Sequence, residues 1–356
     1  MANEWLKDIY NVEIKPSSVT GKFNMNGQIG WVTHRSGWGK IMGQCNLLHN
    51  DQGVIFDGFL DMTFGTGRPG AIKSNKIPYK EPWVGFFHNT PEIPEWYDYN
   101  LSLKGLTSNI DFLHSLENCK GIYTCSNYVR DWLHVRLKHR NIMVETIYHP
   151  CAGDDIKTKF NWDKFYSSNE RKLVDIGTWL RRFTSIHILG SRIDSDYRIC
   201  KLWPVGFNHE DPRFEYIHNA IRDEATYLNL PHQRDQWENP NIINIYGLDN
   251  QQYDTLLSEN IVFLDTWDSN ANNVIMECIE RHTPIVVRRH SAIEEYLGKE
   301  YPLYYETLSN VNDLLTEDKL YYATNYLRDL YQTNKFSIEK FLSNIFESTI
   351  YTSISL

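Results

Sequence analysis

The residues with the clearest capacity for chemistry lie between Phe263 and Val287. This run is typical of four consecutive elements: a buried strand ending at Leu264, a polar loop over Asp265–Asn272, a helix over Asn273–Arg281 and a second strand over Pro284–Val287. A polar loop that ends at a helix start directs free backbone N–H groups, and the positive end of the helix dipole, at a ligand. Such an arrangement suits a pyrophosphate.

Several side chains of this run offer hydrogen bonds to the same ligand. Asn270, Asn272 and Asn273 can cap the helix or contact phosphate, and capping is the commoner use of asparagine at such a position. Glu277 follows in the helix, where its carboxylate can accept two hydroxyl hydrogen bonds, as a ribose would offer. The alternative for Glu277 is a solvated surface carboxylate; its apolar neighbours and the strand that follows favour a ligand role.

The run from Asn272 to Val287, followed by Ala292–Gly298, resembles the donor site of retaining GT-B glycosyltransferases of the family-4 type. The resemblance implies that Glu277 holds the ribose and that a second Glu, eight positions earlier, contacts the sugar. This chain has Ser269 at that earlier position, with Asp268 beside it. Asp265 and Asp268 are the candidates to compensate.

Three further segments extend the resemblance over most of the chain. Lys172–Arg182 resembles the first strand and loop of the second domain, where such enzymes place basic residues on the donor diphosphate, so that Arg181 and Arg182 are the matching pair. His34–Gly39 resembles the first strand-to-helix turn, in which glycine lets the backbone approach the donor. Gly85–Pro91 places His88 like the histidine near the reacting sugar in several relatives.

Together these interpretations give a set of candidate site residues. The candidates for catalysis are His88, Glu277 and Arg182, and those for donor binding are Gly37, Gly39, Arg181, Arg182, Ser269, Asn270, Asn272, Asn273 and Glu277. Simpler alternatives stay open, because His88 can be a hydrogen-bonded structural residue, the arginines can be solvated charges, and the glycine turn lacks a full GxGxxG spacing. For Tyr253 and Glu295 we favour a packing role.

Alternating strand and helix patterns must position these residues. Strands are predicted at Gln28–His34, Gly53–Asp57, Trp83–Phe87, Gly121–Cys125 and Met143–Tyr148, and again at Lys172–Ile176, Arg198–Trp203, Ile242–Tyr246, Ile261–Leu264 and Pro284–Val287. The first two, with a helix from Trp38 to His49 between them, read as one β-α-β step. Alternation of this kind predicts an α/β fold whose parallel sheets are covered by helices on both faces.

A polar segment from His149 to Glu170 separates two such series. We expect GT-B architecture: a Rossmann-like acceptor-side domain over 1–150, a Rossmann-like donor-binding domain over 151–318 that faces it across a central cleft, and helices over 319–356 that cross back to the first domain. The acceptor would meet variable loops, here Thr63–Lys80 and Pro91–Leu103.

Composition excludes several other classes of protein. The 356 residues carry a net charge of −9, which disfavours nonspecific binding to nucleic acid or anionic lipid. No apolar run approaches the ~18 residues of a membrane span, and the six cysteines form no CxxC pair. We expect a cytoplasmic protein, with peripheral attachment to a membrane left open.

Three common motifs of metal, nucleophile and phosphate sites are absent. The sequence lacks HExxH, GxSxG and Walker patterns, and Asp194-Ser195-Asp196 reads as a turn, so no metal ion is predicted as a cofactor. The leading hypothesis is transfer of a hexose or pentose from a nucleoside-diphosphate sugar to a hydroxyl of a glycan, glycoprotein or lipid-linked sugar, with retention implied by the resemblance. Rival hypotheses are a noncatalytic GT-B module that binds a nucleotide sugar or glycan and, less favoured, a glycosyltransferase acting on modified DNA bases; no oligomeric state is specified.

Overall fold

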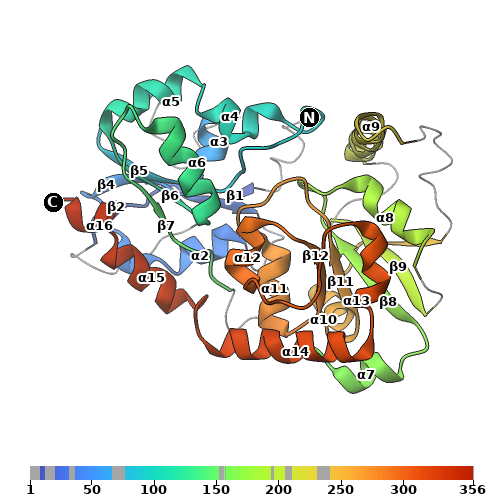
Figure 1. Cartoon of the computed structure of the whole chain (residues 1–356). Helices are drawn as coiled ribbons and strands as arrows, with labels where there is room; N and C mark the ends of the chain where they lie inside the picture. Colours follow the sequence, from blue (N-terminus) through green and yellow to red (C-terminus); the bar gives the residue numbers. More distant parts are fainter. Residues whose placement is uncertain are drawn as a thin grey trace. The chain divides into compact units, whose positions relative to one another are not determined.

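The computed structural model describes residues 9–12, 21–31, 37–65, 77–151, 156, 158–193, 196–204, 211–230 and 241–355. The chain forms two compact units (Figure 1). Apart from Met1, unit 1 joins Asp154–Trp267 to Val274–Thr333, and unit 2 joins Ala2–Gly153, Asp268–Asn273 and Asn334–Leu356. The chain therefore leaves unit 1 for six residues at Asp268 before it returns at Val274.

Unit 2 is built on a five-stranded parallel sheet in the order β2-β4-β5-β6-β7. The strands are β2 (Phe23–Asn24), β4 (Val54–Asp57), β5 (Trp83–Phe87), β6 (Cys119–Thr124) and β7 (Val144–Thr146). The helices are α2 (Trp38–Gly43), α3 (Leu60–Gly65), α4 (Leu103–Leu106), α5 (Ile110–Ser115), α6 (Asn127–Leu137), α15 (Ile338–Glu347) and α16 (Thr349–Ser353), with 3₁₀ turns at Asn46–Leu48, Tyr99–Leu101 and Leu116–Asn118.

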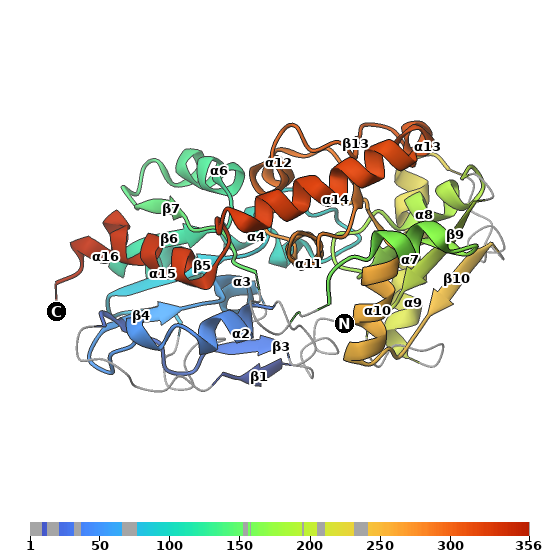
Figure 2. The ribbon, with the colours of Figure 1, turned by 90° about the horizontal axis from the view of Figure 1, so that it is seen from below.

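Alternating side chains of β5 divide the core of unit 2 into two layers. Val84 and Phe86 join a cluster with residues of α2, α15 and α16, whereas Trp83 and Phe87 join a cluster with residues of α3 to α6. Successive side chains of a strand point to opposite faces, and both faces of this sheet are covered, so every residue of β5 is buried. Figures 1 and 2 show the C-terminal α15 and α16 in red beside the blue strands of this sheet.

The β-α-β step predicted from Gln28 is wrong. The observed strand β3 (Ile29–Trp31) pairs antiparallel with β1 (Ile9–Asn11) in a separate two-stranded sheet, while residues 32–34 lie outside the described part of the chain. The neighbour of β4 in the parallel sheet is β2 and not β3. Phe23 of β2 stacks on Phe56 of β4 with ring centroids 5.0 Å apart. A two-residue strand is too short to produce a periodic signal in the sequence.

Unit 1 is built on a six-stranded parallel sheet in the order β10-β9-β8-β11-β12-β13. The strands are β8 (Arg171–Ile176), β9 (Tyr197–Leu202), β10 (Ile242–Ile245), β11 (Ile261–Leu264), β12 (Ile285–Arg288) and β13 (Tyr304–Tyr305). The helices are α7 (Trp162–Ser167), α8 (Phe183–Gly190), α9 (Pro212–Tyr227), α10 (Asn250–Glu259), α11 (Asn273–Arg281), α12 (Ser291–Leu297), α13 (Val311–Leu314) and α14 (Glu317–Gln332), with a 3₁₀ turn at Leu308–Asn310.

The order of these strands reverses between β8 and β11. The chain winds outward from β8 to β10 and then returns to place β11 on the other side of β8. The two parallel sheets with their helices confirm the predicted α/β class. Within the described residues, no helix combines the length and the apolar character needed to cross a membrane.

Candidate functional site

The reversal between β8 and β11 is a topological switch point, where ligands of open α/β sheets bind beyond the carboxyl ends of the strands. The loop after β8 carries Arg182, the residue after β11 is Asp265, and Arg288 is the last residue of β12. Because these three strands are parallel neighbours, the three side chains come to one edge of the unit 1 sheet.

Asp265 is the anchor of this edge. Arg288 donates two hydrogen bonds to it, from Nε to Oδ1 at 2.6 Å and from Nη2 to Oδ2 at 2.9 Å, while Ser185 Oγ donates to Oδ2 at 2.5 Å. The third nitrogen of Arg288, Nη1, donates to the carbonyl of Glu306. All three nitrogens of the Arg288 guanidinium are therefore engaged, two by Asp265 and one by Glu306, and the sequence interpretation did not select this residue.

The guanidinium of Arg182 lies on an aromatic ring and, unlike that of Arg288, is not held by hydrogen bonds to the described residues. Its guanidinium lies over the ring of Trp267, 3.9 Å from the centroid, and its Nε is 3.7 Å from Oδ1 of Asp265. The guanidinium makes no hydrogen bond to any residue in the described part of the chain, and its Nε is buried. Burial lowers the pKa of Arg182, yet a guanidinium stays charged at neutral pH. Its N–H donors are thus directed to this edge without a hydrogen-bond acceptor among the described residues.

Arg181, the neighbouring candidate, faces the interior of the loop. Its Nε donates to the carbonyl of Ile176 at 2.8 Å and its Nη1 to that of Trp179 at 3.1 Å, and the residue is 6% exposed. A Cβ at Gly177, which has φ +81°, would lie 3.1 Å from Nη2 of Arg181. The Arg181 guanidinium therefore stabilises the conformation of the loop after β8 through hydrogen bonds to backbone carbonyls.

The backbone N–H groups at the start of α8 already bind a carboxylate of the protein. Glu224, from α9, accepts hydrogen bonds from the backbone N–H groups of Phe183 and Thr184 and from the indole Nε1 of Trp267 at 3.1 Å. Burial raises the pKa of Glu224, and these donors oppose that shift. Glu224 thereby fixes the Trp267 ring on which Arg182 lies. Its carboxylate is also the anion that the backbone N–H groups at the start of α8 bind.

Glu277 lies in α11 with one carboxylate oxygen engaged. Its Oε2 accepts from the hydroxyl of Tyr253 at 2.5 Å and from Nη1 of Arg281 at 3.3 Å, whereas Oε1 accepts from no described residue. Arg281 also donates to Asp254. Burial and the Glu277 carboxylate raise the pKa of Tyr253 well above its ordinary value, so the phenol stays a donor. Tyr253 and Arg281 thus orient Glu277 while leaving Oε1 available.

The loop before α11 makes its side-chain contacts in unit 2. Asn270 Nδ2 donates to the carbonyls of Phe87 (3.3 Å) and His88 (3.1 Å), and its Oδ1 accepts from Ser126 Oγ at 2.7 Å. Asp268 Oδ2 accepts from the backbone N–H of Glu92 at 2.8 Å. The remaining polar candidates are placed as follows: Ser269 is buried beside Asn270, and Asn272 and Asn273 are half-buried at the start of α11.

His88 follows β5 in unit 2 and holds a defined tautomer. Its Nε2 lies 2.9 Å from the carbonyl of Gly58, which can only accept, so Nε2 carries the proton. Burial lowers the pKa of His88 to about 3, which keeps the imidazole neutral at physiological pH. Asp61 accepts from the backbone N–H groups of His88 and Asn89, at 2.8 and 2.9 Å, and burial raises the pKa of Asp61 to about 7.

The glycine turn is only partly described. Gly37 and Gly39 are buried at the start of α2, with Gly37 in an extended conformation at φ −84° that any residue can adopt, while His34, Arg35 and Ser36 lie outside the described residues. Most of the predicted acceptor loop Thr63–Lys80 and two residues of the Asp194–Asp196 stretch also lie outside them. Within the described residues, no three His, Cys, Asp or Glu side chains gather as metal ligands would.

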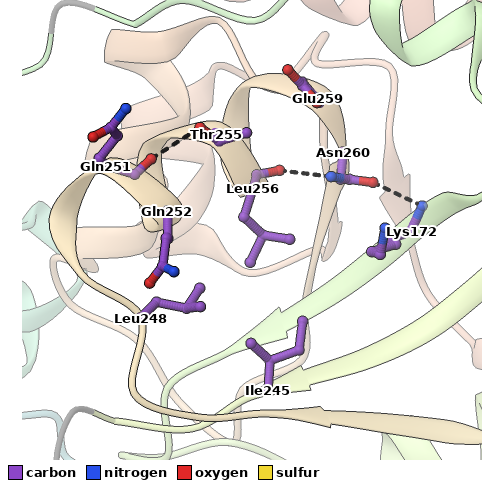
Figure 3. Close-up of a pocket in the computed structure, with 9 residues that line it drawn as sticks. All are labelled: Lys172, Ile245, Leu248, Gln251, Gln252, Thr255, Leu256, Glu259 and Asn260. Carbon is purple, nitrogen blue, oxygen red and sulfur yellow. Dashed lines mark hydrogen bonds between the residues drawn. The ribbon is translucent and has the colours of Figure 1, made fainter.

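A separate depression of unit 1, about 410 Å³ in volume, holds none of the predicted site residues (Figure 3). Side chains of α10 form one wall, Lys172 comes from β8 and Ile245 from β10. Asn260 closes one end, accepting from the backbone N–H of Lys172 at 3.0 Å and donating to the carbonyl of Leu256 at 2.9 Å.

The sequence interpretation missed several residues that build this edge. Arg288, Glu224 and Trp267 orient Asp265 and Arg182, and Tyr253, assigned to packing, holds Glu277. A signal existed for Arg288, because it ends a strand next to β11 in a parallel sheet. None existed for Glu224, which reaches its partners from the middle of a long amphipathic helix.

No protein-family model matches the chain, and no curated protein sequence does. Solved structures do share its fold. One is the UDP-forming α,α-trehalose-phosphate synthase of Burkholderia xenovorans, with a TM-score of 0.56, 11% identity, and an alignment covering 89% of this chain and 78% of the synthase. Another is trehalose-6-phosphate synthase from E. coli bound with UDP-2-fluoro glucose, with a TM-score of 0.56, 11% identity, and coverage of 88% and 77%.

A third structure, also of trehalose-6-phosphate synthase, gives a TM-score of 0.57 at 11% identity and covers 89% of this chain and 76% of the synthase. Likeness at this identity establishes the fold. The chain has the GT-B glycosyltransferase fold, with two Rossmann-like domains.

Proposed function

We propose that this protein transfers a sugar from a nucleoside-diphosphate sugar to a hydroxyl acceptor. The observation that carries the proposal is that unit 1 contains both a guanidinium without a hydrogen-bond acceptor among the described residues and a carboxylate with one oxygen that accepts from none of them. Arg182 offers N–H donors at the switch point, and Glu277 offers Oε1 in the helix that begins there. A diphosphate needs the N–H donors of a guanidinium, and a ribose needs a carboxylate oxygen that accepts hydrogen bonds from its hydroxyls.

Most of the candidate residues have a role in this scheme. Glu277 accepts hydrogen bonds from the ribose hydroxyls, and Arg182 binds the diphosphate. When the bond to the sugar breaks, negative charge develops on the leaving diphosphate, and Arg182 with the backbone N–H groups that open α11 stabilises it. Asn272 and Asn273 belong to that helix start, and Arg181 supports the site by holding the loop that presents Arg182.

His88, Gly37 and Gly39 complete the scheme from unit 2. His88 contributes a neutral, singly protonated imidazole near the reacting sugar, and the two glycines allow close approach of the backbone to the donor. The E. coli synthase with the same fold is bound with UDP-2-fluoro glucose, which supports a UDP-type donor. Retention of the anomeric configuration, membership of the family-4 type, independence of metal ions and an acceptor on a glycan, glycoprotein or glycolipid are parts of the same proposal.

A two-step experiment tests the proposal. A thermal-shift screen against UMP, UDP, GDP and dTDP should name the base, since a bound nucleotide raises the melting temperature by mass action. Radiolabelled sugars on the selected nucleotide are then incubated with the protein, with and without a glycan acceptor mixture, in EDTA and in manganese. Transfer of the sugar to the acceptor in EDTA supports sugar transfer without a metal ion; activity only with manganese removes metal independence.

The second candidate is a noncatalytic module that binds a nucleotide sugar. It is favoured by the loop before α11, where Ser269 stands in place of a carboxylate and Asp268 is engaged by the backbone N–H groups of Glu92 and Ser269. In the same assay, this candidate predicts a nucleotide-dependent thermal shift without release of labelled sugar from any donor. A melting temperature that none of the nucleotides raises contradicts both candidate functions.

A further inference from the structure

The amide of Asn270 sits in a closed hydrogen-bonding environment in unit 2. The residue is 2% exposed, its Nδ2 donates to the carbonyls of Phe87 and His88, and its Oδ1 accepts from the hydroxyl of Ser126. Reversing the amide would turn its oxygen toward two carbonyl oxygens, so the network fixes the orientation. Both ends of the Asn270 amide are therefore used within the protein.

These bonds act on the backbone that carries His88. The N–H of His88 donates to Asp61 Oδ2 at 2.8 Å, its carbonyl accepts from Asn270 at 3.1 Å, and its Nε2 donates to the carbonyl of Gly58 at 2.9 Å. Two of the three anchors, Asp61 and Gly58, come from the elements that follow β4. Only Asn270 comes from the segment that leads into α11, three residues before the helix begins.

A second contact anchors the same segment. Asp268 Oδ2 accepts from the backbone N–H of Glu92 at 2.8 Å, and the hydroxyl of Tyr128 lies 3.4 Å from that oxygen. The segment is thus held at two points, Asp268 and Asn270, on either side of Ser269. It cannot shift along the end of β5 without breaking both sets of hydrogen bonds.

We propose that Asn270 is a positioning residue, not a donor ligand: its N–H donors fix the carbonyls of Phe87 and His88, and so hold the backbone that carries His88. The inference rests on the proposed function, because it assigns Asn270 an effect on sugar transfer. Its chemical content is specific. Loss of the two N–H donors should disturb the transfer step and leave nucleotide binding intact.

Two substitutions test the donors. Asn270→Ala removes the amide, and Asn270→Asp keeps its shape while placing a carboxylate oxygen against two carbonyl oxygens. Asn109→Ala is the matched control, because Asn109 also makes three hydrogen bonds, from Nδ2 to the carbonyl of Phe64 and to Oδ1 from the N–H groups of Asp111 and Phe112, but at the start of α5. Circular dichroism establishes that all three variants fold.

For both Asn270 variants, we expect kcat for transfer to fall by about tenfold to a hundredfold, as misplacement of a reacting group does. The Kd for UDP should stay within about twofold of the wild-type value, because neither substitution changes a contact to the nucleotide. Asn109→Ala should keep the wild-type kcat. A raised Kd for UDP with unchanged kcat would overturn the inference and make Asn270 a donor-binding residue; wild-type kinetics in both variants would overturn it as well.

Amide hydrogen exchange separates this inference from the proposed function. If the wild-type protein transfers no sugar, the proposed function fails, and exchange decides the positioning role alone. Faster exchange at His88 and Asn89 in Asn270→Ala than in Asn109→Ala supports a role of Asn270 in fixing this backbone. Equal exchange at these amides in the two variants contradicts it.

Discussion

The hydroxyl of Tyr253 lies 2.5 Å from Oε2 of Glu277 and joins the first turn of α10 to the middle of α11. Both helices follow strands of one parallel sheet, so their first turns come to its carboxyl edge. The bond leaves Oε1 of Glu277 without a partner among the described residues. A carboxylate oriented on one oxygen and open on the other is suited to bind a diol.

Glu277→Gln should weaken UDP binding by about tenfold to a hundredfold, since hydrogen bonds to a charged group contribute ~1.5–3 kcal/mol. Titration calorimetry with UDP and with its 2′,3′-dideoxy analogue checks the cause. The wild-type protein should prefer UDP, and the variant should bind both alike. Glu294→Gln, which alters a helix glutamate paired with Arg289, is the control and should retain the preference.

Tyr253→Phe should destabilise unit 1 by ~1–2 kcal/mol, because it removes a donor from a buried carboxylate. Urea unfolding measures the stability, and UDP titration should show an affinity reduced several-fold as Glu277 loses its orientation. Tyr304→Phe also removes a hydroxyl bonded at 3.0 Å, to the carbonyl of Gly298. That control should cost stability and leave the UDP affinity unchanged; equal losses of affinity in both variants would assign the effect to general loosening.

Arg182→Ala should reduce affinity for UDP far more than for uridine, because the lost guanidinium would bind the diphosphate and not the base or ribose. A loss of about 1.5–3 kcal/mol is expected for UDP by calorimetry. Arg182→Lys should restore part of it. Arg222→Ala, which removes an exposed arginine beside Asp223, should change neither affinity. Equal loss for uridine and UDP would argue against a diphosphate contact.

Lys201→Met should cost ~3–5 kcal/mol of unfolding free energy, because it leaves Asp175 buried without its cation. Nζ of Lys201 lies 2.5 Å from Oδ2 of Asp175, and the two residues are 3% and 5% exposed. The exposed pair of Lys164 and Glu259 supplies the control, and Lys164→Met should cost at most ~1 kcal/mol. Urea unfolding of both variants checks the contrast.

His149→Gln should flatten the loss of stability in acid. Burial lowers the pKa of His149 to about 4, and its Nδ1 lies 2.8 Å from the carbonyl of Pro150. The unfolded chain takes up this proton near pH 6.5 and the folded protein only near pH 4, so His149 destabilises the fold by up to ~1.4 kcal/mol per pH unit as pH falls through that window. His114→Gln, at an exposed position, should keep the wild-type pH dependence of urea midpoints.

The sequence predicted the regular elements well where the pattern was long and uninterrupted. The bounds of β5, β11 and α11 are the predicted ones, because a strand buried on both faces and a helix between a polar loop and a strand leave clear patterns. It failed at β3, because the pattern of that segment does not show that it pairs with β1 (Ile9 with Trp31, Asn11 with Ile29) and not with the parallel sheet. It also missed the two-residue strand β2.

What the sequence determined by itself is the class of the fold, since periodicity and residue type are local properties. The anion-binding role of Glu277 and the arginine pair stays a prediction. The tertiary structure decided which atoms are available. Arg181 and Arg182 are adjacent, but the loop turns at Gly177 (φ +81°) and Leu180 (φ +57°), so one guanidinium binds loop carbonyls and the other lies on Trp267. Asn270 likewise finds its partners at Phe87, His88 and Ser126, more than 140 positions away, and hydrogen bonds at that separation leave no local signal in the sequence.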